Sequence, residues 1–431
     1  MKRENMEQEL FLGVNATIEQ RWQALSLNIQ ACYERLAGDR EVVREAGIMW
    51  TCGHVAISAV DVSQINEQIG RLVNWYRRQL PLQGAICWYL TATPPGDLAA
   101  RMFARGFEPN WQPHWMWCEL SYLKEHHTYP SNVSIRVVED DPVWQVDNLP
   151  YYNKKDVAIL AALAHVQPRR VWHLAAFRGQ QVVGRCFLNV TTGERGIGGL
   201  FSMGVIPAAR KQGIGTALAQ AACELARQVG CHHVVLNATE MGEPVYRRVG
   251  FQSMGYGHTW YLRDRTLAAS ALTEEQVALL EAVGRGDIAL LDEASKRVEE
   301  RVLHEAAPNG LTPLDIAVRC QQSASAEWLV KHGVCLDLLS AWDLGWKEQI
   351  PILLASHPEL VNLQRGEWRA TPLHTAIQRD DLELVKLLLV VPHDLSIKDG
   401  EFGSTALGWA NYFERPEMIA LIEQCQTRWK R

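Results

Sequence analysis

Hydrophobic and polar positions follow two different periods along this chain, and the changes of period divide it into three segments. Near residues 126–135 (HHTYPSNVSI) a helical, aromatic-rich segment gives way to strand-like alternation. Near residues 263–276 (RDRTLAASALTEEQ) helical spacing begins and continues to the last residue. A chain of 431 residues is too long for one compact core, so these changes predict domains at residues 1–126, 133–263 and 274–431.

The middle segment predicts a mixed sheet with one long helix. Five runs have the alternation and residue types of strands, at residues 134–139, 170–177, 181–190, 199–206 and 232–238. Residues 215–230 repeat alanine and leucine at helical spacing and end at Gly230, which can cap the helix. The order strand, glycine turn, helix, strand predicts one βαβ unit inside this sheet.

The last segment contains an internal repeat. TPLDIA begins at Thr312, TPLHTA at Thr371 and TALGWA at Thr405, and each is followed by a second apolar helix. Two units without this turn, at residues 277–294 and 336–354, complete a series marked by alanines at positions 282, 317, 341, 376 and 410. The segment resembles an ankyrin array of about five units in which the first and last act as caps. The short interval between positions 317 and 341 predicts a missing hairpin before the third unit.

Composition narrows the class of protein. Hydrophobic residues make up 47% of the chain and charged residues 21%, which is typical of soluble globular proteins. The formal net charge of −6 argues against a general nucleic-acid binder and suits a cationic partner. The ten scattered cysteines form no CxxC or metal-like cluster, so we expect reduced thiols, no metal site and a cytoplasmic location. We expect neither a signal peptide nor a membrane span, because no apolar run is long enough.

A glycine turn, RKQGIG at residues 210–215, stands at the centre of the predicted βαβ unit. It does not fit the P-loop pattern GxxxxGK[ST], and it fits the dinucleotide pattern GxGxxG poorly. It does fit Q/R-x-x-G-x-G/A, through Arg210, Gly213 and Gly215. In such a turn the backbone N–H groups converge on a pyrophosphate, and the positive end of the following helix completes the anion site.

Residues 201–251 as a whole resemble the Gcn5-related N-acetyltransferase (GNAT) superfamily. They run as strand, V-x-P, R-x-x-G-x-G, long helix, strand and Y-x-x-x-G-F. The resemblance implies acetyl-CoA as the cosubstrate, with main-chain contacts to its pantetheine arm from Met203, Gly204 and Val205. It also implies that the pyrophosphate is held by Arg210, Lys211, Gln212, Gly213, Ile214, Gly215 and Thr216.

The same resemblance assigns the candidate catalytic residue. Tyr246 falls where the family places a tyrosine near the CoA sulfur, and a phenol can protonate the leaving thiolate; the alternative is a packing tyrosine. Thr239 and Gly242 depart from the asparagine and alanine of many family members, so Asn237 and Thr239 are weaker candidates for cofactor contacts. The general base stays open among Glu240, Glu243, His258 and a water chain.

The N-terminal segment resembles the second half of the same fold. ARGF at residues 104–107 matches RRVGF at 247–251, and each is followed by an aromatic strand. No R-x-x-G-x-G occurs before residue 125, so the segment lacks an anion site. We therefore predict an α+β tandem GNAT protein with a degenerate first half, followed by an all-α ankyrin array; an unrelated α+β domain is the alternative. Trp111, Trp115, Trp117 and the pair Tyr151–Tyr152 are candidates for a substrate groove between the halves or for core positions.

These features predict an N-acetyltransferase in which a primary amine attacks the thioester directly. A backbone N–H near Val205 would stabilise the oxyanion. The acidic balance and tandem layout favour a small cationic amine, such as a polyamine or peptide antibiotic acetylated in self-resistance. One alternative is a protein acetyltransferase that recruits its protein partner through the ankyrin array. Another is a non-enzymatic scaffold that binds acetyl-CoA. Neither nucleic acid nor membrane is an expected partner.

Overall fold

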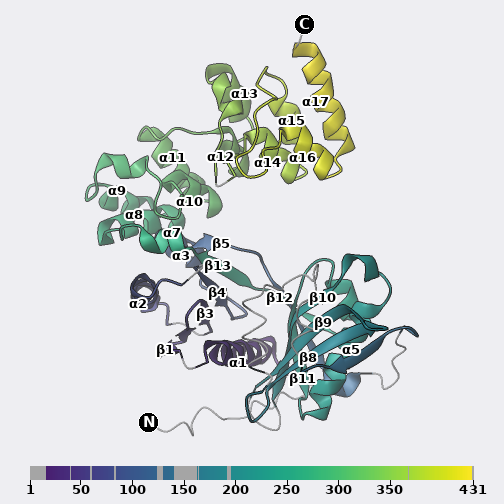
Figure 1. The fold of residues 1–431 in the computed structure, drawn as a ribbon. Helices are drawn as coiled ribbons and strands as arrows, with labels where there is room; N and C mark the ends of the chain where they lie inside the picture. Colours follow the sequence, from purple (N-terminus) through teal and green to yellow (C-terminus); the bar gives the residue numbers. More distant parts are fainter. Residues whose placement is uncertain are drawn as a thin grey trace. The chain divides into compact units, whose positions relative to one another are not determined.

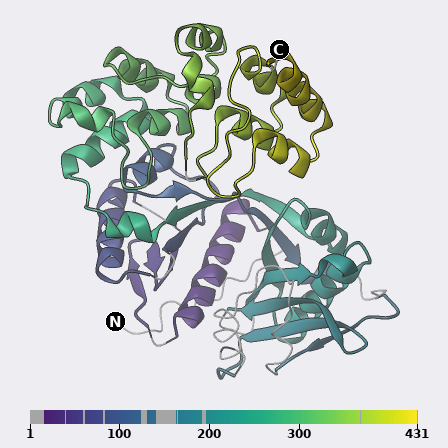
Figure 2. The ribbon, with the colours of Figure 1, turned by 45° about the horizontal axis from the view of Figure 1, so that its top comes forward.

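The chain groups into two compact units. A computed structural model describes residues 16–38, 40–58, 61–81, 84–123, 130–139, 163, 165–191, 196–366 and 368–429. One unit combines residues 1–96 and 107–268, and the other combines residues 97–106 and 269–431. Figure 1 and Figure 2 show the first unit as sheets with flanking helices and the second as helices throughout. The domain boundaries predicted near residues 126–133 and 263–274 stay predictions.

A seven-stranded sheet dominates the first unit, and it contains the predicted βαβ unit. The strands lie in the order β12-β6-β11-β10-β9-β8-β7, and only β10 and β11 are parallel to each other. The five predicted strands and the predicted helix are present. Their bounds are β7 Ser134–Val137, β8 Val171–Arg178, β9 Gln181–Val190, β10 Ile197–Val205, α5 Ile214–Gln228 and β11 His233–Ala238, followed by α6 Glu243–Val249 and β12 Gln252–Tyr256.

Both faces of this sheet are buried. Helix α5 packs on one face, where Leu188, Leu218 and Val234 share a core. Helix α1 (Ile18–Ala37) packs on the other face, where Trp115 and Val235 are buried. Successive strand residues therefore alternate between two apolar environments, which explains the near-continuous hydrophobic runs in this part of the sequence.

A six-stranded sheet forms the N-terminal half of the first unit, in the order β1-β2-β3-β4-β13-β5. Strands β3 and β4 are parallel and are connected through α2, so this half also contains a βαβ unit, as the tandem prediction requires. The bounds are β1 Val43–Glu45, β2 Ile48–Trp50, β3 His54–Ile57, α2 Ile65–Arg78, β4 Ala85–Tyr89, β5 Glu108–Pro109 and β13 His258–Leu262, and α7 (Asp264–Ala268) follows β13.

The two sheets exchange one strand each. Strand β6 (His114–Glu119) follows β5 in the chain but lies between β11 and β12 in the seven-stranded sheet. Strand β13 follows β12 but lies between β4 and β5 in the six-stranded sheet. Only Gly257 joins β12 to β13, and a side chain there would overlap the indole of Trp115. Each half therefore depends on the other to complete its sheet.

The second unit consists largely of five helix pairs, as the ankyrin repeat predicts. The five marker alanines at positions 282, 317, 341, 376 and 410 are all fully buried. Threonines in extended conformation precede four of the first helices and accept backbone hydrogen bonds from them. The pairs are α8 Glu274–Arg285 and α9 Ile288–Ser295, α10 Pro313–Arg319 and α11 Ser323–Lys331, α12 Leu338–Asp343 and α13 Gln349–Ser356, α14 Pro372–Gln378 and α15 Leu382–Leu388, and α16 Ala406–Tyr412 and α17 Pro416–Trp429.

The hairpin bridges of the array agree with the alanine spacing. Arg365 pairs with Ala370 before α14, and Lys398 pairs with Thr405 before α16. Only residues 332–337 separate α11 from α12, and no such bridge occurs within them. This is the place where the interval between positions 317 and 341 predicts a missing hairpin.

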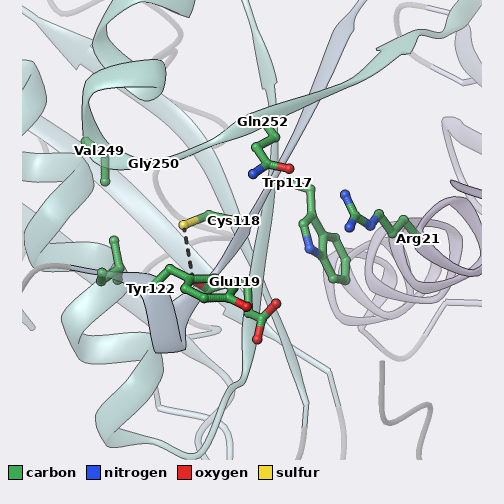
Figure 3. A pocket seen from close by; sticks show the side chains of 9 residues that line it. Arg21, Trp117, Cys118, Glu119, Tyr122, Val249, Gly250 and Gln252 are labelled. Carbon is green, nitrogen blue, oxygen red and sulfur yellow. Dashed lines mark hydrogen bonds between the residues drawn. The ribbon is translucent and has the colours of Figure 1, made fainter. Parts of the chain in front are cut away.

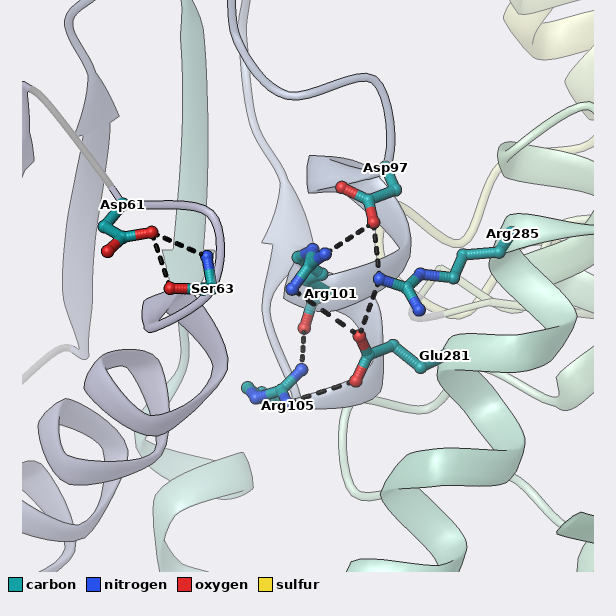
Figure 4. Close-up of polar contacts among 7 residues, drawn as sticks. All are labelled: Asp61, Ser63, Asp97, Arg101, Arg105, Glu281 and Arg285. Carbon is teal, nitrogen blue, oxygen red and sulfur yellow. Dashed lines mark hydrogen bonds and ion pairs between the residues drawn. The ribbon is translucent and has the colours of Figure 1, made fainter. Parts of the chain in front are cut away.

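Helix α3 (Leu98–Ala104) belongs to the helical unit although its flanking strands belong to the first unit. It packs on α8 so closely that a Cβ at Gly284 would lie 2.7 Å from the Cβ of Ala100. Figure 4 shows the polar contacts beside this packing. Two carboxylates, Asp97 and Glu281, accept contacts from three arginines, Arg101, Arg105 and Arg285, at 2.6–4.0 Å. Because Glu281 and Arg101 are almost completely buried, this network fixes α3 as the cap of the first helix pair.

Candidate active site

Strand β10 is bulged at the residues predicted to contact the pantetheine arm. Phe201 pairs with Phe187 and Gly204 pairs with Arg185, so two residues, Ser202 and Met203, oppose a single residue of β9. Ser202 has a positive φ of 48°, which is unusual outside glycine. Such a bulge bends the strand and leaves backbone groups out of the ladder. Met203, Gly204 and Val205 therefore lie where main-chain groups are available to a ligand.

The parallel pairing of β10 and β11 ends before either strand does. It runs from Ile197 opposite His233 to Leu200 opposite Leu236, while β10 continues to Val205 and β11 to Ala238. The two strands therefore separate towards their carboxyl ends. In parallel sheets this is the end at which ligands bind, and the glycine turn starts from the same end.

The turn at residues 210–213 has the conformation that its glycine predicts. Gly213 has a φ of 80° and Lys211 a φ of 60°, and α5 begins directly afterwards at Ile214. No side chain caps this helix, so its first N–H groups keep their hydrogen-bonding capacity. Among the described residues, a Cβ at Gly213 would meet only Pro130, at 3.5 Å, so none of the others fills the outer side of the turn. The turn thus has the conformation, the donors and the space that a pyrophosphate requires.

The polar side chains of the turn hold its shape. Arg210 donates from Nε to the carbonyl of Val205 at 3.1 Å, which ties the turn back to the end of β10. Gln212 donates to the carbonyl of Ala208 at 3.1 Å and accepts from Arg178. Lys211 is exposed. The charge-assisted role predicted for Arg210 is therefore shared with a structural one.

Tyr246 lies in the middle of α6 and is 6% exposed. Its ring packs edge-on against Phe251 at 5.8 Å, and its Cε2 atom would lie 3.1 Å from a Cβ at Gly242. Helix α6 adjoins the turn, because a Cβ at Gly215 would lie 3.6 Å from Cγ1 of Val245. The predicted pyrophosphate turn and the helix that carries the predicted acid are therefore neighbours.

The two weaker candidates have different surroundings. Thr239 starts α6, since its Oγ1 accepts from the N–H of Gly242 at 3.1 Å and its carbonyl accepts from Gly242 and Glu243. Asn237 is half-buried on β11, opposite Trp115. The hydroxyl of Thr239 therefore already has a structural role.

The structure places the three candidate side chains for the general base, Glu240, Glu243 and His258, in different surroundings. Glu243 opens α6, binds Arg247 at 2.7 Å and lies 3.3 Å from the ring of His114. The Arg247 guanidinium, with a smaller effect of His114, holds the pKa of Glu243 below its usual range. Glu240 is exposed between β11 and α6, and His258 is half-buried on β13, where burial lowers its pKa. His114 is the residue in this group that sequence reasoning missed.

The aromatic residues predicted for a substrate groove differ in their exposure to solvent. Trp115 and Trp117 are buried core residues, whereas Trp111 is half-exposed and packs edge-on against Trp88 at 5.1 Å. The pair Tyr151–Tyr152 lies outside the described residues.

One pocket, of about 340 Å³, lies at the opposite end of β11 from the turn (Figure 3). Glu119 lines it and pairs with His233, the first residue of β11. Arg21 enters it from α1 and lies over the ring of Trp117, 5.8 Å from the ring centre. Since the turn leaves from the carboxyl ends of the strands, this pocket does not belong to the predicted donor site.

Comparison with known families decides the identity of the middle segment. Residues 134–251 match the acetyltransferase (GNAT) family. This segment is a GNAT domain. Residues 309–341 and 368–400 match the ankyrin repeat, so the predicted family resemblances and fold class are confirmed.

Individual relatives and solved structures match different shares of the chain. It is 36% identical over 63 residues to a glucosamine 6-phosphate N-acetyltransferase of Trypanosoma brucei brucei, and this alignment covers 15% of the chain and 43% of the relative, less than half of the relative's length. A GCN5-related N-acetyltransferase from Kribbella flavida has a TM-score of 0.42 and 14% identity, over 55% of this chain and 95% of that one. A tandem GNAT protein from the clavulanic acid biosynthesis pathway has a TM-score of 0.39 and 17% identity, over 55% and 87%.

The described residues of the GNAT domain fit acetyl-CoA, the donor that this family uses. The open turn before α5 suits the pyrophosphate, and the bulge of β10 suits the pantetheine amides. Among the helices that the structure describes, not one combines the length and apolar character that a membrane crossing requires. The part of the chain that the structure describes holds no group of three or more His, Cys, Asp or Glu side chains arranged for a metal ion.

Proposed function

We propose that this protein transfers the acetyl group of acetyl-CoA to the primary amine of a small cationic molecule. The observation that supports this most directly is the proximity of the pyrophosphate turn to α6, which carries Tyr246. The turn holds the donor by its phosphates, and Tyr246 protonates the leaving thiolate. A backbone N–H near Val205 stabilises the oxyanion of the tetrahedral intermediate.

The acceptor class follows from charge and from the tandem layout. A net charge of −6 favours a cationic partner, and a polyamine or peptide antibiotic is the proposed acceptor, in a self-resistance role. The relative from Trypanosoma brucei brucei is a glucosamine 6-phosphate N-acetyltransferase by name, which adds an amino sugar phosphate to the acceptors worth testing.

The test is acetyl transfer to a panel of amines. The full chain is incubated with acetyl-CoA and with spermidine, polyamine-containing antibiotics or glucosamine 6-phosphate, and products are read by mass. A gain of one acetyl group on a cationic member, formed much more slowly by the Tyr246→Phe variant, supports the proposal. Acetylation of glucosamine 6-phosphate alone overturns the cationic acceptor class, and no acetylated product overturns the function.

A second candidate function rests on the ankyrin repeats at residues 309–341 and 368–400. Ankyrin arrays present extended binding surfaces, so the array can recruit a protein whose lysine is then acetylated. Because α3 caps the array, the bait for this test is the full chain with Tyr246→Phe rather than the array alone. A defined partner that the wild-type chain acetylates supports this candidate. A defined partner without acetylation favours a scaffold that only binds acetyl-CoA.

A further inference from the structure

A histidine supplied by the N-terminal half lies beside the helix that carries Tyr246. His114 opens the exchanged strand β6, opposite Ala238 of β11 and Tyr256 of β12. Its Nδ1 lies 3.3 Å from Oε2 of Glu243, and its Nε2 lies 2.7 Å from Oγ of Ser253. The ring stacks on Tyr256 with centres 4.6 Å apart. Both ring nitrogens of this buried histidine therefore have defined partners.

The partners define which nitrogen carries the proton. Glu243 is held ionised by Arg247, which binds its other oxygen at 2.7 Å, and an ionised carboxylate can only accept hydrogen bonds. Nδ1 of His114 is therefore the protonated nitrogen, and it donates to Glu243. Nε2 is left as an acceptor, and it accepts a hydrogen bond from the hydroxyl of Ser253.

Ser253 extends this chain of contacts towards solvent. Its Oγ accepts from the N–H of Gly255 at 3.2 Å and donates to His114, so one lone pair stays available. The residue is exposed on β12, unlike His114, which is 6% exposed. Ser253 is therefore the solvent-facing member of this pair and His114 the buried one.

The hydrogen-bonded series of Ser253, His114 and Glu243 lies near the predicted donor site. The last pair between β10 and β11 is Leu200 with Leu236, and His114 lies opposite Ala238, two residues further along the separating strands. Glu243 is one helical turn before Tyr246 on α6. Among the described residues, the charged or titratable groups recorded against the ring are Glu243 from α6 and Tyr256 from β12.

We propose that His114 accepts the proton of the attacking amine through Ser253, with Glu243 stabilising the imidazolium that forms. This inference rests on the proposed acetyl transfer. An ammonium substrate loses two protons as the C–N bond forms and the C–S bond breaks. The first amine proton passes to Oγ of Ser253, while the hydroxyl proton of Ser253 moves to Nε2 of His114. The imidazolium then releases that proton to water. The leaving thiolate takes a proton from Tyr246, and the second amine proton restores the phenol.

The arrangement gives the degenerate half a direct part in the reaction. A hydroxyl that faces the attacking amine, an imidazole and a carboxylate are here linked by hydrogen bonds in that order. In such a series the carboxylate orients the imidazole base and stabilises its charged form. Here the imidazole comes from the first half and the other two groups come from the GNAT half. The strand exchange is what brings them together.

The test compares pH profiles of kcat/KM for the wild type, His114→Gln and Ser253→Ala, with spermidine and acetyl-CoA as the probes. A general base works only in its deprotonated form, so a wild-type rate that rises with pH is the behaviour expected of a base in this place. His114→Gln is expected to lose about 100-fold in kcat, with that rise removed and KM for acetyl-CoA unchanged. Ser253→Ala, at an exposed position, is expected to lose about tenfold in kcat without a change in melting temperature. His232→Gln, at an exposed histidine directly before β11, is the matched control.

The outcomes distinguish a failure of the proposed function from a failure of this inference alone. If the wild type acetylates no amine on the panel, the proposed function fails and this inference fails with it. If an amine other than spermidine is the acceptor, that amine replaces spermidine as the probe. If His114→Gln keeps its rate and pH profile, or loses activity only through a raised KM and a lowered melting temperature, His114 merely anchors α6. If Ser253→Ala keeps full activity, no proton passes through Ser253.

Discussion

Each half of the first unit contains one βαβ unit, and the turn that starts the helix differs between them. Before α5, Gly213 allows a positive φ and the first N–H groups are uncapped. Before α2, Asp61 occupies the turn, and its carboxylate accepts from the N–H and hydroxyl of Ser63 at 2.9 and 2.6 Å (Figure 4). An internal carboxylate takes up donors and repels a phosphate. Neither helix has a side-chain cap, so the two turns differ in the glycine of one and the internal carboxylate of the other, and only the glycine turn fits the predicted anion site.

The helices that follow show a second difference. A glycine with positive φ follows each helix within two residues, Gly106 after α3 and Gly250 after α6, and a phenylalanine comes next. Tyr246 stands four residues before Gly250, and Met102 stands four residues before Gly106. Met102 is fully buried and has no proton to donate. The N-terminal half thus has neither the glycine turn nor a tyrosine at the position that corresponds to Tyr246, and its helix α3 packs with the ankyrin array.

The largest effect is expected from the ion network of α3. Glu281→Gln leaves Arg101 and Arg105 without their buried carboxylate, and removing one partner of a buried pair costs about 3–5 kcal/mol. Thermal unfolding should show the helical unit melting at a clearly lower temperature. Glu293→Gln, which breaks only the exposed pair with Lys296, should change little. Equal melting temperatures for the two variants would mean that α3 does not stabilise the array.

The comparison of Tyr246 with Met102 predicts the next effect. Tyr246→Phe removes the phenol but keeps the packing on Phe251, so kcat should fall about 100-fold while KM for acetyl-CoA is unchanged. Steady-state kinetics with a thiol-detecting assay gives both constants. Tyr412→Phe, at an exposed tyrosine of the array, is the control. A Tyr246→Phe variant with wild-type kcat would leave Tyr246 as a packing residue only.

A substitution can give the turn before α5 the carboxylate that the turn before α2 has in Asp61. Gly213→Asp places a carboxylate in the turn and strains a backbone with a φ of 80°, so KM for acetyl-CoA should rise at least about tenfold. Gly345→Asp is the matched control, because Gly345 has a φ of 76° in the helical unit and no described atom lies within 4 Å of an added Cβ there. Similar kinetics in both variants would contradict the assignment of the turn to the donor.

The smallest effect is expected in the degenerate half. Asp61→Ala removes the internal carboxylate, but Met102 and the turn without glycine remain, so no second donor site should appear. Titration calorimetry should give one CoA per chain before and after the substitution. A second binding event in either protein would show that the first half retains a donor site.

Sequence pattern predicted the strands and helix of residues 134–238 and the helix pairs of the second unit, because the core imposes a clear period there; α1, α2 and β1–β3 were not predicted. The alternation in β8 and β9, the glycine at the start of α5 and the repeated alanines each depend on local packing. The strand exchange was not predicted, because β6 and β13 are apolar on both faces and could pair in either sheet. His114 was missed for the same reason. It is one polar residue in an aromatic run, and only the exchange places it beside Glu243 and Ser253.

The strand exchange also determines when each half can fold during synthesis. β4 leaves the ribosome early, but its partner β13 consists of residues 258–262, at the end of the GNAT half. Until those residues emerge, β4 is an open edge with unpaired backbone groups, and β5 has no sheet to join. The first sheet therefore closes only after nearly the whole second sheet has been made, so the two halves are a single folding unit with slow, long-range pairing.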